Sequence, residues 1–436
     1  MVQPAVEQAP ADARIALQSE RLRDVLGRLA TAPSPYWQAK LRGVDIAAVR
    51  GVEDIAALPF TTKRELRDAY PYGALAVSRE RVVRVHASSG TSGKPTIVAY
   101  TRRDVELFAE VNARAIAMAG GGPGDVFQVT FGYGLFTGGL GLHYGAERLG
   151  ATVVPASAGN TGLQVKLLAD LGVSGMAGTP SFGLALAERA AADGLLERIS
   201  LRYGLFGAEP WSEELRRRLE AAWGGLDARD LYGLSEVIGP GVAAECAEKS
   251  GLHVFDDHFY PEVVDPASGR PLEVGEVGEL VLTTLTKEAT PLLRYRTGDV
   301  TRLVPGDCPC GRTHRRIARI SGRVDDMLVV RGVNVYPSAV EAVLLADPAF
   351  ASHYALVVDR RGTLSALEVH VELTSERHRG AAERLAISLE EHLRLRVQVV
   401  VAAPGALPRS EVGKVKRVFQ RTAEADELVE YLAARR

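Results

Sequence analysis

Cysteine is scarce and net charge is almost absent in this chain of 436 residues. Three cysteines are too few for a disulfide framework, and an odd number argues against a secreted protein. The 52 basic and 54 acidic side chains leave a net charge of −2, whereas a protein that binds nucleic acid needs a basic excess. Residues 1–13 also lack the basic stretch and apolar core of a signal peptide. We therefore predict a cytoplasmic protein that binds no nucleic acid.

Long hydrophobic runs are also rare. Residues 126–146 form a run of 21 residues without a charged side chain, which is long enough for a membrane helix. The run contains six glycines together with Gln128, Thr130, Thr137 and His143. This composition predicts a buried, loop-rich segment and no membrane-spanning helix.

The rest of the composition is typical of a globular protein. Apolar residues make up 46% and charged residues 24%, which excludes a disordered or collagen-like chain, and the length predicts more than one hydrophobic core. From residue 81 onward, short apolar runs alternate with amphipathic stretches, a pattern that predicts an α/β fold with a substantial parallel sheet. The expected strands cover 81–87, 125–131 and 151–155, and the expected helices cover 163–171, 182–192 and 213–223.

Changes of pattern along the chain indicate its domains. Residues 15–50 are arginine-rich and predicted to be helical, and Thr62 and Glu65 have the spacing of a capping box. Between about 240 and 324, glycine and proline interrupt strand-like runs, which predicts a β-rich subdomain. A compact α+β unit follows, with strands at 327–330, 354–358 and 366–373, a helix capped by Ser338 and Glu341, and a helix at 386–395. The predicted domains are therefore 1–324 and 325–436.

The strongest local signal is the octet Ser-Ser-Gly-Thr-Ser-Gly-Lys-Pro at 88–95, directly after a predicted strand. Small hydroxylic and glycine residues allow backbone N–H groups to surround phosphate oxygens, and Lys94 adds a mobile positive charge. The octet is not a Walker A loop, because only two residues separate Gly90 from Gly93 and Pro95 follows the lysine. A flexible surface loop is the alternative that the octet alone leaves open.

The octet resembles the phosphate-binding motif of adenylate-forming enzymes, a superfamily that includes acyl-CoA synthetases, peptide-synthetase adenylation domains and luciferases. Five further motifs follow in the order typical of that superfamily, at 207–211, 230–236, 295–299, 321–326 and 413–417. Within the superfamily, the stretches at 131–145, 239–242 and 252–261 are similar to the phenylacetate–CoA ligase group. The resemblance extends over roughly residues 20 to 425.

The resemblance implies a large N-terminal α/β domain with a β-rich subdomain and a small mobile C-terminal domain. It implies that a carboxylate is joined to the α-phosphate of ATP, that pyrophosphate leaves, and that the acyl group passes to CoA. Bringing two anions together requires cations and oriented donors. A carrier-protein phosphopantetheine is an alternative acceptor with the same reactive arm. An inactive nucleotide sensor is disfavoured because the key charged residues are intact, and the family suggests a homodimer.

Each motif residue carries an implied role. Glu236 would hold Mg²⁺, Ser235 would donate to the α-phosphate, and Tyr232 would stack on adenine. Asp299 would accept hydrogen bonds from the ribose hydroxyls, with Arg323 nearby. A packed core aromatic and a turn aspartate are the ordinary alternatives for Tyr232 and Asp299. The complete set of residues implied for ATP is Ser88, Ser89, Gly90, Thr91, Ser92, Gly93, Gly207, Ala208, Glu209, Asp230, Tyr232, Gly233, Ser235, Asp299 and Arg323.

Three residues are implied to be catalytic, namely Lys414, Glu236 and Lys94. Lys414 matches the lysine that bridges the substrate carboxylate and the α-phosphate. Asp325 matches the hinge about which the small domain rotates, and the domain boundary predicted from the sequence pattern falls on it. Lys416 and Arg417 are predicted to form a solvated basic face.

The same comparison places the acid beside the sheet, in an apolar slot with aromatic walls and a floor of small residues. Such a slot suits an aryl ring, so phenylacetate, benzoates and aminobenzoates are the expected acids. Each aromatic taken alone is equally typical of ordinary core. The expected lining is Phe131, Tyr133, Phe136, Gly138, Gly207, Ala208 and Ile238.

All three cysteines fall in one region, as Cys246, Cys308 and Cys310, and His253 lies close to the first. Thiolates with one imidazole suit tetrahedral Zn²⁺ in a structural role. His258 and His314 are alternative fourth ligands, and unliganded thiols are the alternative to any metal.

Lysine is also scarce, with 8 lysines against 44 arginines. Arginine supplies the ordinary surface charge, so each lysine is a candidate for chemistry that needs a compact point charge. Five lysines match no motif and are predicted to lie at the surface: Lys40, Lys63, Lys166, Lys249 and Lys287.

Overall fold

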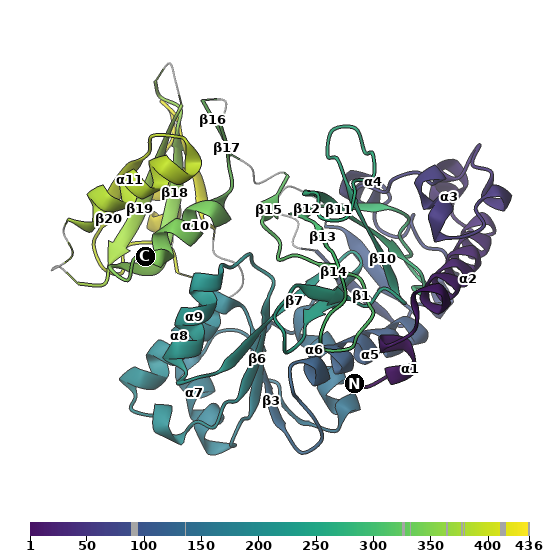
Figure 1. The fold of residues 1–436 in the computed structure, drawn as a ribbon, viewed down its shortest axis with the longest axis horizontal. Coiled ribbons are helices and arrows are strands. Elements are labelled where there is room, and N and C mark those ends of the chain that lie inside the picture. The colour runs from purple at the N-terminus through teal and green to yellow at the C-terminus, as the bar shows by residue number, and fades with distance from the viewer. Residues whose placement is uncertain are drawn as a thin grey trace.

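A computed structural model describes residues 1–88, 95–135, 137–324, 328–331, 333–362, 365–375, 378, 380–409 and 416–434. The part up to residue 324 forms the larger body of the molecule. The residues from 328 onward form a separate C-terminal lobe, shown in light green and yellow in Figure 1.

A nine-stranded sheet, with the order β13-β14-β9-β8-β7-β6-β5-β3-β4, crosses the large part. Its parallel strands are β3 (Val126–Val129), β4 (Thr152–Val154), β5 (Gly175–Gly178), β6 (Tyr203–Gly207) and β7 (Asp227–Leu234). Antiparallel strands continue the sheet as β8 (Ile238–Glu245), β9 (Leu252–Val254), β14 (Arg316–Ile317) and β13 (Leu303–Val304). The predicted α/β class with a parallel sheet is confirmed.

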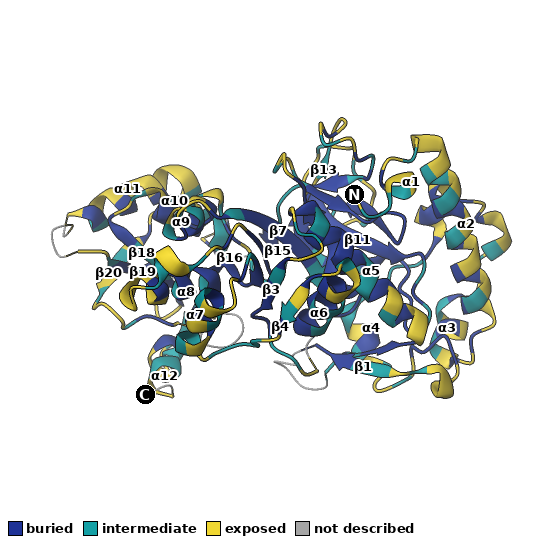
Figure 2. Ribbon diagram, turned by 90° about the horizontal axis from the view of Figure 1, so that it is seen from below, coloured by how far each residue is buried: buried dark blue, intermediate teal, exposed yellow. Residues whose placement is uncertain are grey.

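Helices cover both faces of this sheet because successive strand residues point to opposite sides. Ala177 and Leu205 pack into the core with α5 (Arg102–Met118) and α6 (Gly138–Leu149). Their neighbours Met176 and Phe206 pack into a second core with α7 (Thr161–Asp170), α8 (Pro180–Ala192) and α9 (Glu213–Ala222). Figure 2 shows the strands between these layers as buried, whereas the helices carry buried residues together with intermediate and exposed ones.

The β-rich subdomain contains a second sheet with the order β10-β11-β12-β15. Its strands are β10 (Phe259–Val264), β11 (Gly278–Thr284), β12 (Tyr295–Thr301) and β15 (Gly322–Arg323). A two-stranded sheet pairs β1 (Arg84–Ala87) with β2 (Ile97–Tyr100). The N-terminal helices are α1 (Pro4–Glu7), α2 (Ala11–Ala30), α3 (Pro35–Lys40) and α4 (Lys63–Asp68), and short 3₁₀ turns cover Ile46–Ala48, Val52–Ala57, Arg79–Arg81 and Leu196–Arg198.

The C-terminal lobe has its own four-stranded sheet, with the order β20-β19-β18-β21. The strands are β18 (Phe350–Asp359), β19 (Ala366–Leu373), β20 (Gln398–Ala402) and β21 (Val418–Arg421), and β16 (Leu328–Val330) pairs with β17 (Val333–Val335) beside it. The helices are α10 (Pro337–Ala346), α11 (Ala381–Leu393) and α12 (Glu427–Ala433). The predicted hinge Asp325 lies outside the described residues, so the domain boundary stays a prediction.

Three local predictions need correction. The stretch 126–146 is less loop-rich than expected, because its second half belongs to α6. Residues 15–50 form two helices and a 3₁₀ turn. No capping box forms at Ser338, because α10 begins earlier with Tyr336 as its N-cap and the Ser338 hydroxyl donates instead to the backbone carbonyl of Ser321. By contrast, the capping box of Thr62 and Glu65 is present at α4.

No helix in the described ranges is long and apolar enough to span a bilayer.

Candidate active site

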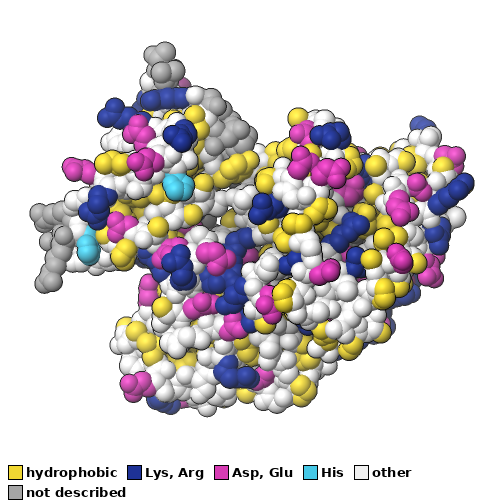
Figure 3. All heavy atoms as spheres, viewed as in Figure 1, with side chains coloured by type: hydrophobic (Ala, Val, Ile, Leu, Met, Phe, Trp, Pro, Cys, Tyr) yellow, Lys and Arg dark blue, Asp and Glu magenta, His cyan; other side chains and the backbone are white. Residues whose placement is uncertain are grey.

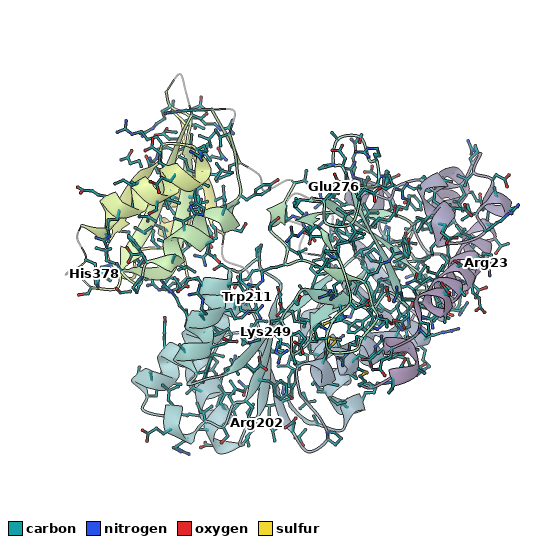
Figure 4. All side chains as sticks on the ribbon, viewed as in Figure 1. Arg23, Arg202, Trp211, Lys249, Glu276 and His378 are labelled. Carbon is teal, nitrogen blue, oxygen red and sulfur yellow. The ribbon has the colours of Figure 1, made fainter. Side chains whose placement is uncertain are left out.

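A cleft of about 660 Å³ opens at the carboxyl ends of the parallel strands. Thr130 follows β3, Thr179 follows β5 and Ala208 follows β6, and all three line the cleft. The other wall comes from β12 and β15 of the second sheet. Figure 3 shows the surface hollowed between the C-terminal lobe and the large part, and Trp211 of the cleft lining is labelled at this junction in Figure 4. Parallel strands thus bring residues from distant motifs to one edge.

All described residues that are predicted to bind ATP line this cleft. They are Ser88, Gly207, Ala208, Glu209, Asp230, Tyr232, Gly233, Ser235, Asp299 and Arg323, and Glu236 joins them. Ser89, Gly90, Thr91, Ser92, Gly93, Lys94 and Lys414 lie outside the described residues. Their roles remain predictions.

The Gly-Ala-Glu motif makes a tight turn at the end of β6. A Cβ at Gly207 would lie 2.0 Å from the Leu231 carbonyl oxygen, so no larger residue fits there without a shift of backbone. Ala208 adopts the left-handed conformation with φ 69°, which is costly for a residue with a side chain. The Glu209 carboxylate accepts the Ser181 N–H at 2.8 Å and thereby fixes the turn to α8. The sequence therefore places strained backbone directly in the cleft wall.

Asp299 is held by two donors on opposite sides. The Tyr232 hydroxyl donates to Oδ2 at 2.6 Å, and the Arg323 guanidinium donates to Oδ1 at 2.6 Å. These two bonds orient the Asp299 carboxylate. Burial and the neighbouring Asp299 carboxylate raise the pKa of Tyr232 well above its usual value, which keeps the phenol protonated as a donor.

Glu236 lies at the turn between β7 and β8 and is almost completely buried. The Lys63 ammonium pairs with its carboxylate at 3.1 Å, and Lys63 itself lines the cleft. Ser235 lies beside it, with its hydroxyl 3.4 Å from that of Thr137. An anionic oxygen donor that faces a cleft with oriented hydroxyls is suited to bind Mg²⁺ together with phosphate.

The prediction that unmatched lysines lie at the surface is wrong for Lys287, which is completely buried. It is also wrong for the side chain of Lys40, which pairs with Glu65 at 2.5 Å. Lys63 is partly exposed but has the specific partner described above. Burial lowers the pKa of Lys287 to about 8, although the carboxylates of Asp104 and Glu236 oppose that shift.

Asp230 meets a cation that the motifs did not indicate. The guanidinium of Arg319 approaches its carboxylate at 3.3 Å and lies over the Trp211 ring at 4.7 Å from the centroid. Burial raises the pKa of Asp230 to about 6, while Arg319 opposes the shift. The Glu245 carboxylate accepts the backbone N–H of Asp230 at 2.8 Å. This part of the cleft is therefore supported by a buried network of charges.

The predicted acyl residues divide between the cleft and its surroundings. Phe131, Gly138, Gly207 and Ala208 line the cleft, whereas Phe136 lies outside the described residues. Ile238 is completely buried in the core. The Tyr133 hydroxyl lies 3.3 Å from Nδ1 of His143, which in turn pairs with Glu147. Tyr133 and Ile238 are absent from the cleft lining, so their contact with an acid stays a prediction.

The cysteines and His253 form one compact cluster, and none of the four residues belongs to the cleft lining. Their candidate ligand atoms all lie within 4.8 Å of one another. The Sγ atoms of Cys246 and Cys308 are 3.6 Å apart, and Sγ of Cys310 is 3.5 Å from Nε2 of His253. Two sulfurs bound to tetrahedral zinc at about 2.3 Å would be about 3.8 Å apart, so this spacing fits such an ion. Burial lowers the pKa of His253 to about 3, which keeps the imidazole neutral, as a metal ligand must be.

The alternative ligands have other partners. His314 bonds to Asp256 at 2.7 Å, and His258 lies 2.9 Å from the Thr286 hydroxyl. Both contacts belong to a buried charged network around Arg114 and Asp257. Within the described part of the chain, His253 is therefore the histidine that completes the cysteine cluster.

The sequence did not reveal the roles of Lys63, Lys287 and Arg319. The small number of lysines drew attention to the first two, but neither belongs to a recognised motif. Arg319 precedes the motif at 321–326 by two residues and is one of many arginines. Only the three-dimensional arrangement distinguishes it from the others.

Comparison with known proteins gives consistent results along the whole chain. Residues 38–285 match the family described as AMP-binding enzyme, and residues 332–422 match the AMP-binding enzyme C-terminal domain. A phenylacetate-coenzyme A ligase from Thermus thermophilus is 48% identical over 442 residues, covering 96% of this chain and 99% of that protein.

Solved structures of 2-hydroxyisobutyryl-CoA ligase are similar to this chain at 28% identity, covering 99% of this chain and 94% of theirs. In the postadenylation state with a bound adenylate the TM-score is 0.90, and in the thioesterification state with CoA it is 0.71. Since coverage is equal, the arrangement of the two lobes here is more similar to that in the postadenylation structure than to that in the thioesterification structure.

Proposed function

The chain belongs to the AMP-binding enzyme family, and we propose on this basis that it is an ATP-dependent aryl acid–CoA ligase acting on phenylacetate or a closely related acid. The observation that carries the proposal is the cleft itself. It combines the Tyr232–Asp299–Arg323 cluster, suited to a ribose, with the Glu236 carboxylate and an apolar wall that includes Phe131. The relative that is 48% identical is named for the same reaction class.

The proposed reaction has two half-reactions. A carboxylate oxygen of the acid attacks the α-phosphorus of ATP, and the bond to the bridging oxygen breaks to release pyrophosphate. The thiolate sulfur of CoA then attacks the acyl carbon, and AMP leaves. Mg²⁺ held by Glu236 would neutralise the phosphates, and Lys414 and Lys94 would supply further positive charge. The other residues of the cleft orient the nucleotide.

The acceptor is proposed to be CoA, and a carrier-protein phosphopantetheine is the alternative because both present the same thiol arm. The apolar wall and the buried aromatics near it favour an aryl acid over a long aliphatic chain. We also propose a homodimer, by analogy with the family, which sedimentation equilibrium would test.

Pyrophosphate release across a panel of acids tests this function. The panel would contain phenylacetate, benzoate, 2-aminobenzoate and a medium-chain fatty acid, each with CoA and with a phosphopantetheinylated carrier protein as acceptor. We expect turnover to be highest with phenylacetate and CoA. Absence of ATP turnover with every aryl acid would overturn the proposal, and selective turnover with the carrier protein would favour the alternative.

Arg218 links the two lobes in the observed arrangement. This arginine of α9 donates to the carbonyls of Leu345, Asp347 and Phe350 at 2.5, 3.1 and 2.8 Å. Leu345 lies in the last turn of α10, where the unpaired carbonyls favour a cation. Rotation of the lobe for thioester formation would break these bonds.

We therefore expect Arg218→Ala to slow acyl-adenylate formation by about tenfold, the effect of about 1.4 kcal/mol on the barrier, because it weakens the adenylating arrangement. Transfer from pre-formed phenylacetyl-AMP to CoA should keep its rate. Arg217→Ala is the matched control, since Arg217 is exposed and pairs with Glu214 of the same helix. Equal losses in both half-reactions, measured separately by rapid quench, would contradict this role.

We further propose that Cys246, His253, Cys308 and Cys310 hold a structural Zn²⁺. Such an ion would join the loop at 305–315 to strands β8 and β9, which belong to the antiparallel part of the large sheet. Chelator-washed protein should retain about one zinc per chain, and His253→Gln should lose it and melt about 5–10 °C lower. His392→Gln, at an exposed histidine of α11, should change neither value. Washed protein without stoichiometric zinc would exclude the ion.

A further inference from the structure

Lys287 is unusual among the lysines in the described part of the large domain because no part of it is exposed to solvent. It lies in the loop between β11 and β12, its side chain is completely buried, and it is not part of the cleft lining. Burial of an ammonium is costly unless hydrogen bonds and other charges compensate for lost hydration. The contacts of Lys287 therefore show which interactions compensate for the burial of its ammonium.

The ammonium spans from its loop to the turn that carries the proposed Mg²⁺ ligand. Nζ donates to the backbone carbonyls of Val237 at 2.6 Å and Glu236 at 3.2 Å. It also lies over the Tyr100 ring, 4.9 Å from the centroid, in a favourable cation–π geometry. Residues 235–237 form the short turn between β7 and β8, so the bound carbonyls belong to the turn itself.

Hydrogen bonds also hold the loop that carries Lys287. The Asp104 carboxylate on α5 accepts the N–H groups of Glu288 at 2.7 Å and Ala289 at 2.9 Å. The Ala289 carbonyl accepts the N–H of Ala76, and Leu285 donates to the His258 carbonyl. Lys287 thus extends from a loop that is held by Asp104 of α5 and by the backbone of Ala76 and His258. These contacts determine the position of its ammonium.

We infer that Lys287 is a positioning residue for adenylation, holding the backbone of Glu236 so that the carboxylate faces the metal–phosphate site in a single orientation. This inference rests on the proposed function. Mg²⁺ requires nearly octahedral ligands at about 2.0–2.1 Å, so a turn with freedom to shift would bind it poorly. The Glu236 carboxylate is paired with Lys63, whereas Lys287 donates to the backbone carbonyl of the same residue.

The test is a magnesium titration of Lys287→Met, which keeps the side-chain volume close to that of lysine and removes the charge and the donors. At saturating ATP and phenylacetate, the Mg²⁺ concentration that gives half-maximal pyrophosphate release should rise about tenfold, and kcat should fall about tenfold. The KM for phenylacetate should remain that of the unaltered enzyme. A role limited to general stability would lower the melting temperature and leave the magnesium midpoint unchanged.

Lys40→Met is the matched control, because Lys40 is a second lysine with a buried side chain and a backbone carbonyl partner, Phe60, away from the cleft lining. Its magnesium midpoint should equal that of the unaltered enzyme. If Lys287→Met does not fold, Lys287→Gln, which removes the charge but keeps an NH₂ donor group, replaces it with the same expected direction.

An unchanged midpoint in a folded Lys287 variant, with an active unaltered enzyme, would overturn the inference alone. An unaltered enzyme that releases no pyrophosphate with any aryl acid would instead overturn the proposed function.

Discussion

Replacing Lys414 by alanine is expected to lower the rate of acyl-adenylate formation by about 100- to 1,000-fold, the loss typical of removing one charge that is directed at a transition state. Transfer of the acyl group from pre-formed phenylacetyl-AMP to CoA should keep most of its rate, because the resemblance assigns Lys414 to the first half-reaction only. Lys414 lies outside the described residues, so the expectation comes from its motif at 413–417. Pyrophosphate release and thioester formation, measured separately, give the two rates.

Lys416→Ala provides the control for this variant. The Lys416 ammonium pairs with Glu427 at 2.9 Å and lies over the Phe419 ring, so its charge is used within the C-terminal lobe. Both half-reactions should therefore stay within about twofold of the unaltered enzyme, as for an exposed ion pair. If Lys414→Ala reduced both half-reactions equally, the division of labour between the two lobe orientations would be wrong.

The second large effect is expected for Glu236→Gln. Glutamine keeps the shape of the side chain but removes the negative charge that Lys63 and the proposed Mg²⁺ share. We expect adenylation to fall by about 100-fold or more and to require far more Mg²⁺, since hard cations prefer anionic oxygen. This magnesium dependence distinguishes the variant from Lys414→Ala, whose magnesium midpoint should not move.

Glu276→Gln serves as its control because Glu276 is exposed and is not part of the cleft lining. Its adenylation rate and magnesium midpoint should match those of the unaltered enzyme. An active Glu236→Gln enzyme with an unchanged magnesium midpoint would mean that another group holds the metal.

Local signals explain why much of the fold could be predicted from sequence. The strand at 366–373 was expected to the residue because it is a short apolar run with clear ends. The capping box of Thr62 and Glu65 also formed, since both partners lie within a single helical turn. Ser338 shows the limit of the same rule. The helix begins one residue earlier, at Pro337, and the Ser338 hydroxyl donates to the backbone carbonyl of Ser321 outside the helix.

Burial of charge was the main feature that the sequence could not show. Lys287 was expected at the surface because most lysines are solvated. It is completely buried instead, and its ammonium contacts Val237 and Tyr100, which are both distant in sequence. The pairing of Arg319 with Asp230 likewise depends on tertiary packing, which brings the segment between β14 and β15 against β7. Motifs identified residues that line the cleft, whereas the charges supporting them depend on tertiary packing.

The central claim is that the acid is activated as an acyl-adenylate. Phenylacetate labelled with ¹⁸O in its carboxylate tests it most directly, because the attacking oxygen stays on the α-phosphorus when CoA displaces AMP. Mass spectrometry of the products of one complete turnover should find one labelled oxygen in AMP and none in pyrophosphate. AMP without label, or label in an inorganic phosphate product, would contradict the account.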